Sequence, residues 1–236
     1  RMTDTTAFSE QIVGGSSNNY TFYAFVSIFK GSEFKNVTLE NVNINMPGIA
    51  GDYVGEGGGT SFANHTVAGA IGGIYKLGTE GEIATVVSGV TVSGNIVGHS
   101  RVGGIVGFIG GIGGTENLMR GSVKIEECFN NAMLVSDYTD PAKAGYATAG
   151  GIVSIVIQTA NDFTLEITGC DNNAPVTGMH AAGILARLSM NGSVLFNDCK
   201  NTDVITTSVI EGVAANSSLV TDKADYEDLV GTASGI

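Results

Sequence analysis

The sequence lacks tryptophan, has only three prolines among its 236 residues, and carries charged side chains at only 14% of positions. Its hydrophobic content of 43% is nevertheless sufficient to bury a core, which excludes a disordered chain. The 35 glycines make the composition unusual for a globular domain. A repeated sequence is the usual cause of such a bias, so we expect internal repeats.

Long hydrophobic runs are also missing. The most apolar stretch, residues 102–114, is short and rich in glycine, whereas a transmembrane helix needs roughly 18 apolar residues. We therefore expect no membrane insertion by this region. The chain begins at Arg1 without a signal-like segment, so we expect a processed or excised region of a longer product.

Basic residues are scarce. The chain has 11 Lys and Arg against 23 Asp and Glu, which gives a formal net charge of −12. Binding to nucleic-acid phosphates or to an anionic membrane requires clustered Lys and Arg, so both are excluded as expected partners. The acidity favours solubility, and calcium is the one ion that it leaves open as a cofactor.

The three cysteines lack the close spacing of a zinc knuckle or a redox motif. Placed in register, they align residues 123–132, 165–174 and 194–203, and two earlier segments fit the same frame. Two apolar columns result, which read Phe34, Val87, Ile125, Ile167, Phe196 and Val37, Val90, Cys128, Cys170, Cys199. Because cysteine occupies a valine position, we expect a stack of buried, reduced thiols.

A second element, glycine followed by a β-branched residue, comes after each of these segments. We place its glycines in one column at positions 73, 104, 151, 183 and 212, separated by 31, 47, 32 and 29 residues. A period near 30 indicates a solenoid or array. The repeats are short and alternate Val and Ile with polar residues, which favours strands over helices.

Strands that recur at this period can stack parallel to one another, so that each column becomes a ladder. The sequence therefore predicts an all-β fold, a parallel β-helix (β-solenoid) of about six coils in one domain spanning residues 1–236. Residues 1–33 would form an N-terminal coil or cap, 34–215 the repeat coils and 216–236 a C-terminal cap, either a short helix or an irregular strand. Asn130, Asn172 and Asn201 fall in register and are expected to form an amide ladder at a corner.

These segments resemble the GLUG repeat of bacterial surface proteins. Residues 102–107, Val-Gly-Gly-Ile-Val-Gly, match its first strand most closely, and residues 34–44 resemble its second strand; weaker likeness extends over most of residues 22–215. The resemblance implies a right-handed β-helix from a secreted or surface-anchored bacterial protein, often of Bacteroides-like organisms. It implies no catalytic residues, because the pattern consists of core and turn positions.

Two long insertions leave the predicted coils at one corner and flank a short coil. Insertions on one edge of a repeat protein often form its binding face, and aromatic side chains beside carboxylates suit carbohydrate recognition. The predicted ligand-binding residues are Tyr53, His65, His99, Arg101, Asp137, Tyr138 and Tyr146. Surface loops without a ligand are the alternative.

Catalytic and metal sites receive no support from the sequence. The three histidines stand at different offsets before the predicted glycines and form no metal set, and no nucleophile motif is present. We expect a non-enzymatic, adhesin-like module at the cell surface or secreted, with a glycan or a host or neighbouring-cell protein as partner. The alternatives are a polysaccharide-lyase-like enzyme, for which Arg101 and Arg187 would be candidate bases, and a structural spacer.

Overall fold

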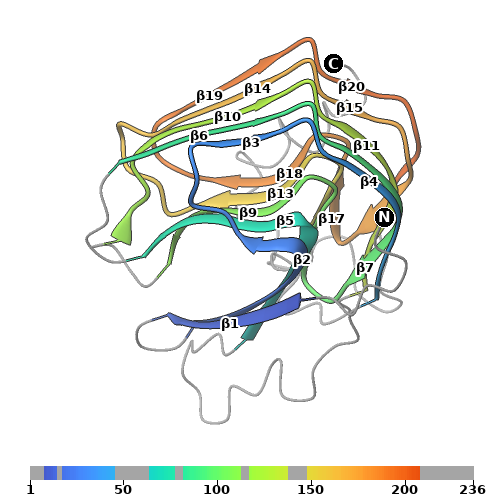
Figure 1. Ribbon diagram of the computed structural model, residues 1–236, viewed down its shortest axis with the longest axis horizontal. Coiled ribbons are helices and arrows are strands. Elements are labelled where there is room, and N and C mark those ends of the chain that lie inside the picture. The colour runs from blue at the N-terminus through green and yellow to red at the C-terminus, as the bar shows by residue number, and fades with distance from the viewer. Residues whose placement is uncertain are drawn as a thin grey trace, which may run out of the picture.

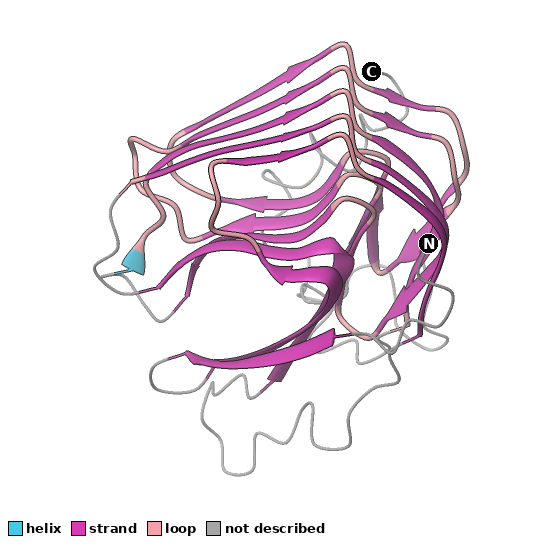
Figure 2. Ribbon diagram, in the orientation of Figure 1, coloured by secondary structure: helices cyan, strands magenta, loops and turns pink. Residues whose placement is uncertain are grey.

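The computed structural model describes residues 8–14, 18–45, 64–77, 82–112, 117–137 and 148–207. Over these residues the fold is all-β: strands are joined by loops and turns, and the one helical segment, drawn in cyan in Figure 2, is a short 3₁₀ turn at Asn117. Accordingly, none of the described residues forms a helix that could cross a membrane. The strands belong to three sheets, which we call A, B and C, and nearly all of their pairings are parallel.

Sheet B contains one strand from each repeat. Its five strands lie side by side in the order β19, β14, β10, β6, β3 (Figure 1). Their bounds are β3 (Glu33–Lys35), β6 (Ile83–Ser88), β10 (Gly121–Glu126), β14 (Thr164–Thr168) and β19 (Ser193–Asn197). Alternate residues point inward, as the sequence alternation requires, and Lys124 and Glu166 pair on the outer face with Nζ and Oε2 2.9 Å apart.

Sheet C follows sheet B in each repeat. β4 (Thr38–Asn45) pairs with β7 (Thr91–Gly98), which pairs with β11 (Phe129–Ser136). The next repeats each contribute two short strands in place of one long strand. These are β15 (Asp171–Asn172) with β16 (Val176–Gly178), and β20 (Lys200–Asn201) with β21 (Ile205–Thr207).

Sheet A closes each repeat, and its strands bend. β2 (Asn18–Ile28) and β5 (Asn64–Leu77) are continuous, while later repeats divide into two arms. The first arms are β8 (Arg101–Gly103), β12 (Thr148–Gly150) and β17 (His180–Ala182); the second arms are β9 (Val106–Ile112), β13 (Val153–Ile157) and β18 (Leu185–Ser189). β1 (Phe8–Gly14) joins β2 in the one antiparallel pairing of the described strands.

A single residue in the left-handed conformation makes the corner between sheets B and C in every repeat. Its φ lies between 48° and 61° at all five positions, Asn36, Gly89, Glu127, Gly169 and Asp198. Glycine, asparagine and aspartate adopt this conformation more readily than other residues, which explains their use here. Glu127 is the exception among the five.

Both predicted apolar columns are confirmed. Phe34, Val87, Ile125, Ile167 and Phe196 pair in this order across sheet B. In the second column the three thiols are free and buried, and each Sγ lies near a carbonyl oxygen of the preceding repeat. The columns belong to one continuous core enclosed by the three sheets.

The predicted asparagine ladder is also confirmed. Asn130 Nδ2 donates to Asn172 Oδ1 over 2.7 Å, and Asn172 Nδ2 donates to Asn201 Oδ1 over 2.7 Å. Each amide also donates to the carbonyl oxygen two residues later. The ladder packs against glycines of sheet A, since a Cβ on Gly151 would lie 2.6 Å from Asn172 Cγ. Glycine is therefore needed there to admit the amide.

One predicted alignment is wrong. Gly73 pairs with Phe108, so it does not share a column with Gly104. The segment that matches residues 102–105 is instead 68–71, because Ala68 pairs with Val102 and Ile71 N donates to Ile105 O. Alanine stands at the glycine position, residue 70, and the residue of β7 that pairs with Asn130 is Val92, so this repeat has no ladder amide to admit. The nearby pair Gly72–Gly73 obscured the true register in the sequence.

Candidate functional site

Four links join sheet C to sheet A at the same corner, and described strands lie at both ends of each link. They connect β4 to β5, β7 to β8, β11 to β12 and β16 to β17, and residues 46–63 and 138–147 make two of them long. The link between the two long ones consists of residues 99–100 alone. This agrees with the predicted pattern of insertions at one corner. Tyr53, Tyr138 and Tyr146 lie outside the described residues.

His99 and Asp137 meet at this corner from consecutive repeats. His99 Nδ1 lies 2.8 Å from Asp137 Oδ1, and the two side chains are 21% and 44% exposed. Asp137 N donates to Gly98 O over 2.9 Å, which fixes the start of the long link beside the short one. The structure thus brings two predicted site residues into direct contact, at the surface.

Buried hydroxyl groups hold the backbone of this corner. Ser100 Oγ donates to Thr66 O over 2.7 Å, and Ser100 N donates to Thr66 Oγ1 over 3.1 Å. Ser136 Oγ donates to Ser100 O over 3.0 Å. Three successive repeats are therefore joined by side-chain hydroxyls directly behind the His99–Asp137 pair. Because these hydroxyls are engaged with backbone groups, we assign them a structural role.

The corrected register also relates His65 to His99. Thr66 and Ser100 are 34 residues apart, as are the paired residues Val67 and Arg101. By the same offset, His65 corresponds in sequence to His99 of the neighbouring repeat. The backbone of His65 pairs with that of Tyr20 on β2.

Arg101 lies inside the structure and is only 1% exposed. Its Cζ lies 5.4 Å from the centroid of the Phe108 ring, so the guanidinium covers the ring of the second arm. Val102, the next residue, belongs to the core enclosed by the three sheets. Arg101 therefore points to the opposite, outer side of sheet A, where the bend brings the two arms together.

The same outer surface carries polar side chains in the next two repeats. Thr148 pairs with Arg101 on one side and with His180 on the other, and Thr148 Oγ1 lies 2.7 Å from Ser154 Oγ across the bend. Arg187 lies on the second arm of the last repeat. Burial, followed by the charge of Arg187, lowers the pKa of His180 to about 4, so His180 is neutral at neutral pH.

We call this region the sheet A bend and define it by six residues on its two arms: Arg101, Phe108, Thr148 and Ser154, which are buried, and His180 and Arg187, which are partly exposed. Of these six residues, only Arg101 is among the ligand-binding residues predicted from the sequence. The sequence does relate three of these residues to one another. Each stands three residues before a glycine of the repeat: Arg101 before Gly104, Thr148 before Gly151 and His180 before Gly183.

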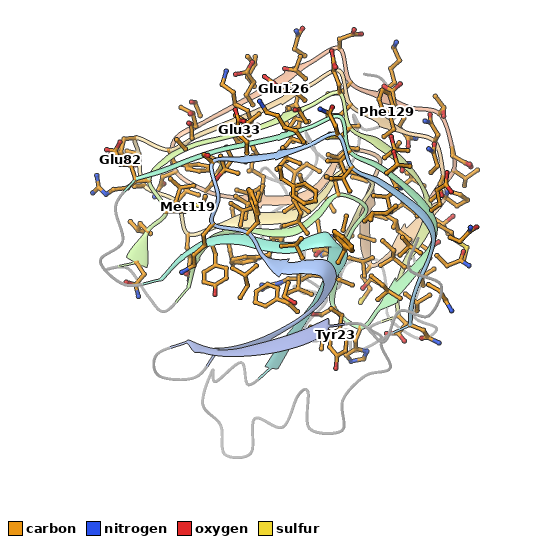
Figure 3. The ribbon with its side chains drawn as sticks, in the orientation of Figure 1. Tyr23, Glu33, Glu82, Met119, Glu126 and Phe129 are labelled. Atoms are coloured by element: carbon orange, nitrogen blue, oxygen red, sulfur yellow. The ribbon has the colours of Figure 1, made fainter. Side chains whose placement is uncertain are left out.

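A separate hollow of ≈ 420 Å³ lies at the corner between sheets B and C. Residues from four repeats line it: Gly89, Thr91, Glu127, Phe129, Gly169, Asp171, Asp198 and Lys200. Figure 3 shows Phe129 at the edge of the fold beside this corner. Three carboxylates against one amine make the hollow acidic, so it differs in charge from the sheet A bend.

Metal coordination finds no support in the described part of the chain, where no group of three or more His, Cys, Asp and Glu could hold an ion. No protein-family model, curated protein or solved structure matches this sequence. The residues themselves must therefore carry any functional assignment.

Proposed function

We propose that the chain is a right-handed parallel β-helix of GLUG-type repeats that acts as a non-enzymatic, adhesin-like binding module. It would belong to a bacterial cell surface or secreted protein and recognise a glycan or a protein of a host or neighbouring cell. The parallel pairing of equivalent strands in three sheets and the confirmed columns support the β-helix. In such repeat proteins, insertions that project from one edge commonly provide the binding face.

One observation carries the binding proposal, namely the contact between His99 and Asp137 at the edge where the four links from sheet C to sheet A emerge. An imidazole and a carboxylate offer a hydrogen-bond donor and acceptors to hydroxyl or amide groups of a ligand. The hydroxyl network of Thr66, Ser100 and Ser136 holds the backbone beneath them. A rigid scaffold under exposed polar groups is typical of a recognition site.

A glycan-array screen of the purified chain, with and without calcium, tests this proposal. For the glycan that binds best, we expect His99→Ala to weaken binding roughly tenfold, the effect of losing one well-placed polar contact. Arg120→Ala is the matched control, because Arg120 also forms an exposed pair between repeats, with Nη1 2.7 Å from Asp162 Oδ2, but on the links from sheet A to sheet B.

The outcomes separate the alternatives. Binding that His99→Ala weakens and Arg120→Ala leaves unchanged supports the corner as the site. Equal effects of both variants would remove this corner from the proposal. Cleavage of the bound glycan would favour the lyase-like enzyme. A blank array together with no binding to cell-surface proteins would leave only the spacer.

A further inference from the structure

Charges are distributed unevenly over the three sheets. The nine described strands of sheet A contain one acidic residue, Glu10 on β1, and five basic or imidazole residues, His65, Lys76, Arg101, His180 and Arg187. The strands of sheets B and C hold five acidic residues, Glu33, Glu40, Glu126, Glu166 and Asp171, and three basic residues, Lys35, Lys124 and Lys200. In a chain with a formal charge of −12, the described strands of sheet A therefore have an excess of Lys and Arg over acidic residues, whereas those of sheets B and C together have an excess of acidic residues.

Aromatic rings brace two of the cations on this side of the fold. Arg101 lies over Phe108, and Lys30 Nζ lies 5.2 Å from the centroid of the Tyr75 ring. Phe22 stacks on Tyr75 with centroids 5.9 Å apart. These rings belong to an apolar cluster separate from the main core. A cation held over a ring has a defined position and keeps its full charge.

The accessible end of the sheet A bend is its last described repeat. His180 and Arg187 are both partly exposed there, whereas Arg101 and Thr148 are buried. Burial and then the charge of Arg187 lower the pKa of His180, so Arg187 lies close enough to act on the imidazole. Arg101 lies two strands away through Thr148, about 10 Å at the usual strand spacing, and adds its positive charge from inside.

We propose that the sheet A bend binds a carboxylate or sulfate group of an acidic glycan, with Arg187 as the contacting cation and His180 as its neighbour. This inference rests on the proposed function, since it specifies the glycan class. A guanidinium donates paired hydrogen bonds to two oxygens of a planar carboxylate or of a tetrahedral sulfate group. The acidic hollow between sheets B and C and the net charge would repel a densely charged polymer such as nucleic acid, so widely spaced anionic groups suit the surface better.

The test compares oligogalacturonate with a neutral cello-oligosaccharide of the same length, by calorimetry at low salt. We expect the wild-type chain to prefer oligogalacturonate. Arg187→Gln should raise its Kd about tenfold, while Lys200→Gln, which removes the same charge from sheet C, should change it less than about twofold. Thermal unfolding establishes that each variant is folded.

A second measurement uses the wild-type chain and does not depend on how the variants fold. The chain has three histidines, so their ring signals can be followed individually by NMR after assignment with His180→Asn. Adding oligogalacturonate should shift the His180 signal more than the His99 signal. An unmoved His180 signal at saturation would overturn the assignment to the bend.

The remaining outcomes distinguish this inference from the proposed function. Binding of neutral but not acidic oligosaccharides would overturn the anionic specificity and leave the glycan-binding module in place. Binding of poly-glutamate with equal affinity, through Arg187, would replace the glycan by an acidic peptide and overturn the inference. Absence of binding to any glycan would overturn both.

Discussion

Replacing Asn172 with alanine tests whether the amide ladder holds the repeats together. The Asn172 side chain is fully buried and takes part in three hydrogen bonds, to Asn201 Oδ1, to Ala174 O and from Asn130 Nδ2, at 2.7–2.8 Å. Each bond contributes about 1 kcal/mol net, and a buried partner left without one costs about 1–3 kcal/mol. We therefore expect Asn172→Ala to lower the free energy of unfolding by about 3–5 kcal/mol.

The adjacent residue provides the control. Asn173 makes bonds of the same kind between repeats, donating to Asn131 Oδ1 over 3.1 Å and accepting from Thr202 Oγ1 over 2.9 Å, but it does so at the exposed surface. Water replaces these bonds, so Asn173→Ala should cost less than about 1 kcal/mol. Both variants are measured by urea unfolding followed by circular dichroism. Equal losses of stability would refute the argument that burial makes the ladder important.

Two further predictions concern the corner residues and the thiols. Glu127→Gly should raise the free energy of unfolding by about 0.5–1 kcal/mol because it relieves a left-handed φ of 50°. Gly169→Ala, where φ is 60° and a Cβ would meet nothing closer than 3.7 Å, should lower the free energy of unfolding by about 1 kcal/mol. Thermal unfolding measures both variants, and changes of the same sign in the two would contradict this prediction. Hydrogen bonding with Cys128 and burial raise the pKa of Cys170 from 9.0 to about 12, and hydrogen bonding with Cys170 and burial raise that of Cys199. Above pH 9 the unfolded chain therefore loses the protons of these two thiols while the folded chain keeps them. The free energy of unfolding is retained below pH 9 and should fall, as the pH rises, by up to about 1.4 kcal/mol per pH unit for each thiol. Urea unfolding between pH 8 and 11 measures the fall, and Cys170→Val, which restores the residue type of Val90 in the same column, should reduce it.

The features that the sequence predicts best are those within one sheet. Residues of one column pair directly across neighbouring strands, so a column such as Val87, Ile125 and Ile167 can be found by alignment alone. The same holds for the asparagine ladder, because each amide bonds to its equivalent in the next repeat. Parallel pairing of identical positions converts sequence register into physical contact.

Sequence alignment gives the wrong register where two similar segments lie close together, as at residues 68–74. Residues 71–74, Ile-Gly-Gly-Ile, fit the glycine element, whereas residues 68–71, Ala-Gly-Ala-Ile, have alanine at the glycine position, so sequence alignment favours 71–74. The structure selects 68–71, because this segment continues the pairing of Val67 with Arg101 and allows the hydrogen bonds between Thr66 and Ser100. Hydroxyl groups at the corner therefore contribute to the register that the glycines alone leave ambiguous.

Contacts across the bend of sheet A follow a different rule. Arg101 and Phe108 belong to the same repeat and lie on different arms. Their contact therefore depends on how the chain bends between the arms, and alignment of one repeat with the next does not reveal it. The pairs Thr148–Ser154 and His180–Arg187 repeat this relation with different chemistry in each repeat. Because three successive repeats divide into two arms but carry different side chains at the bend, the bend can vary its chemistry without disturbing the ladders of the core. Side chains at the bend can therefore change from one repeat to the next while the core residues do not. For this reason the bend is a better place to seek ligand specificity than the columns, whose geometry repeats along the chain.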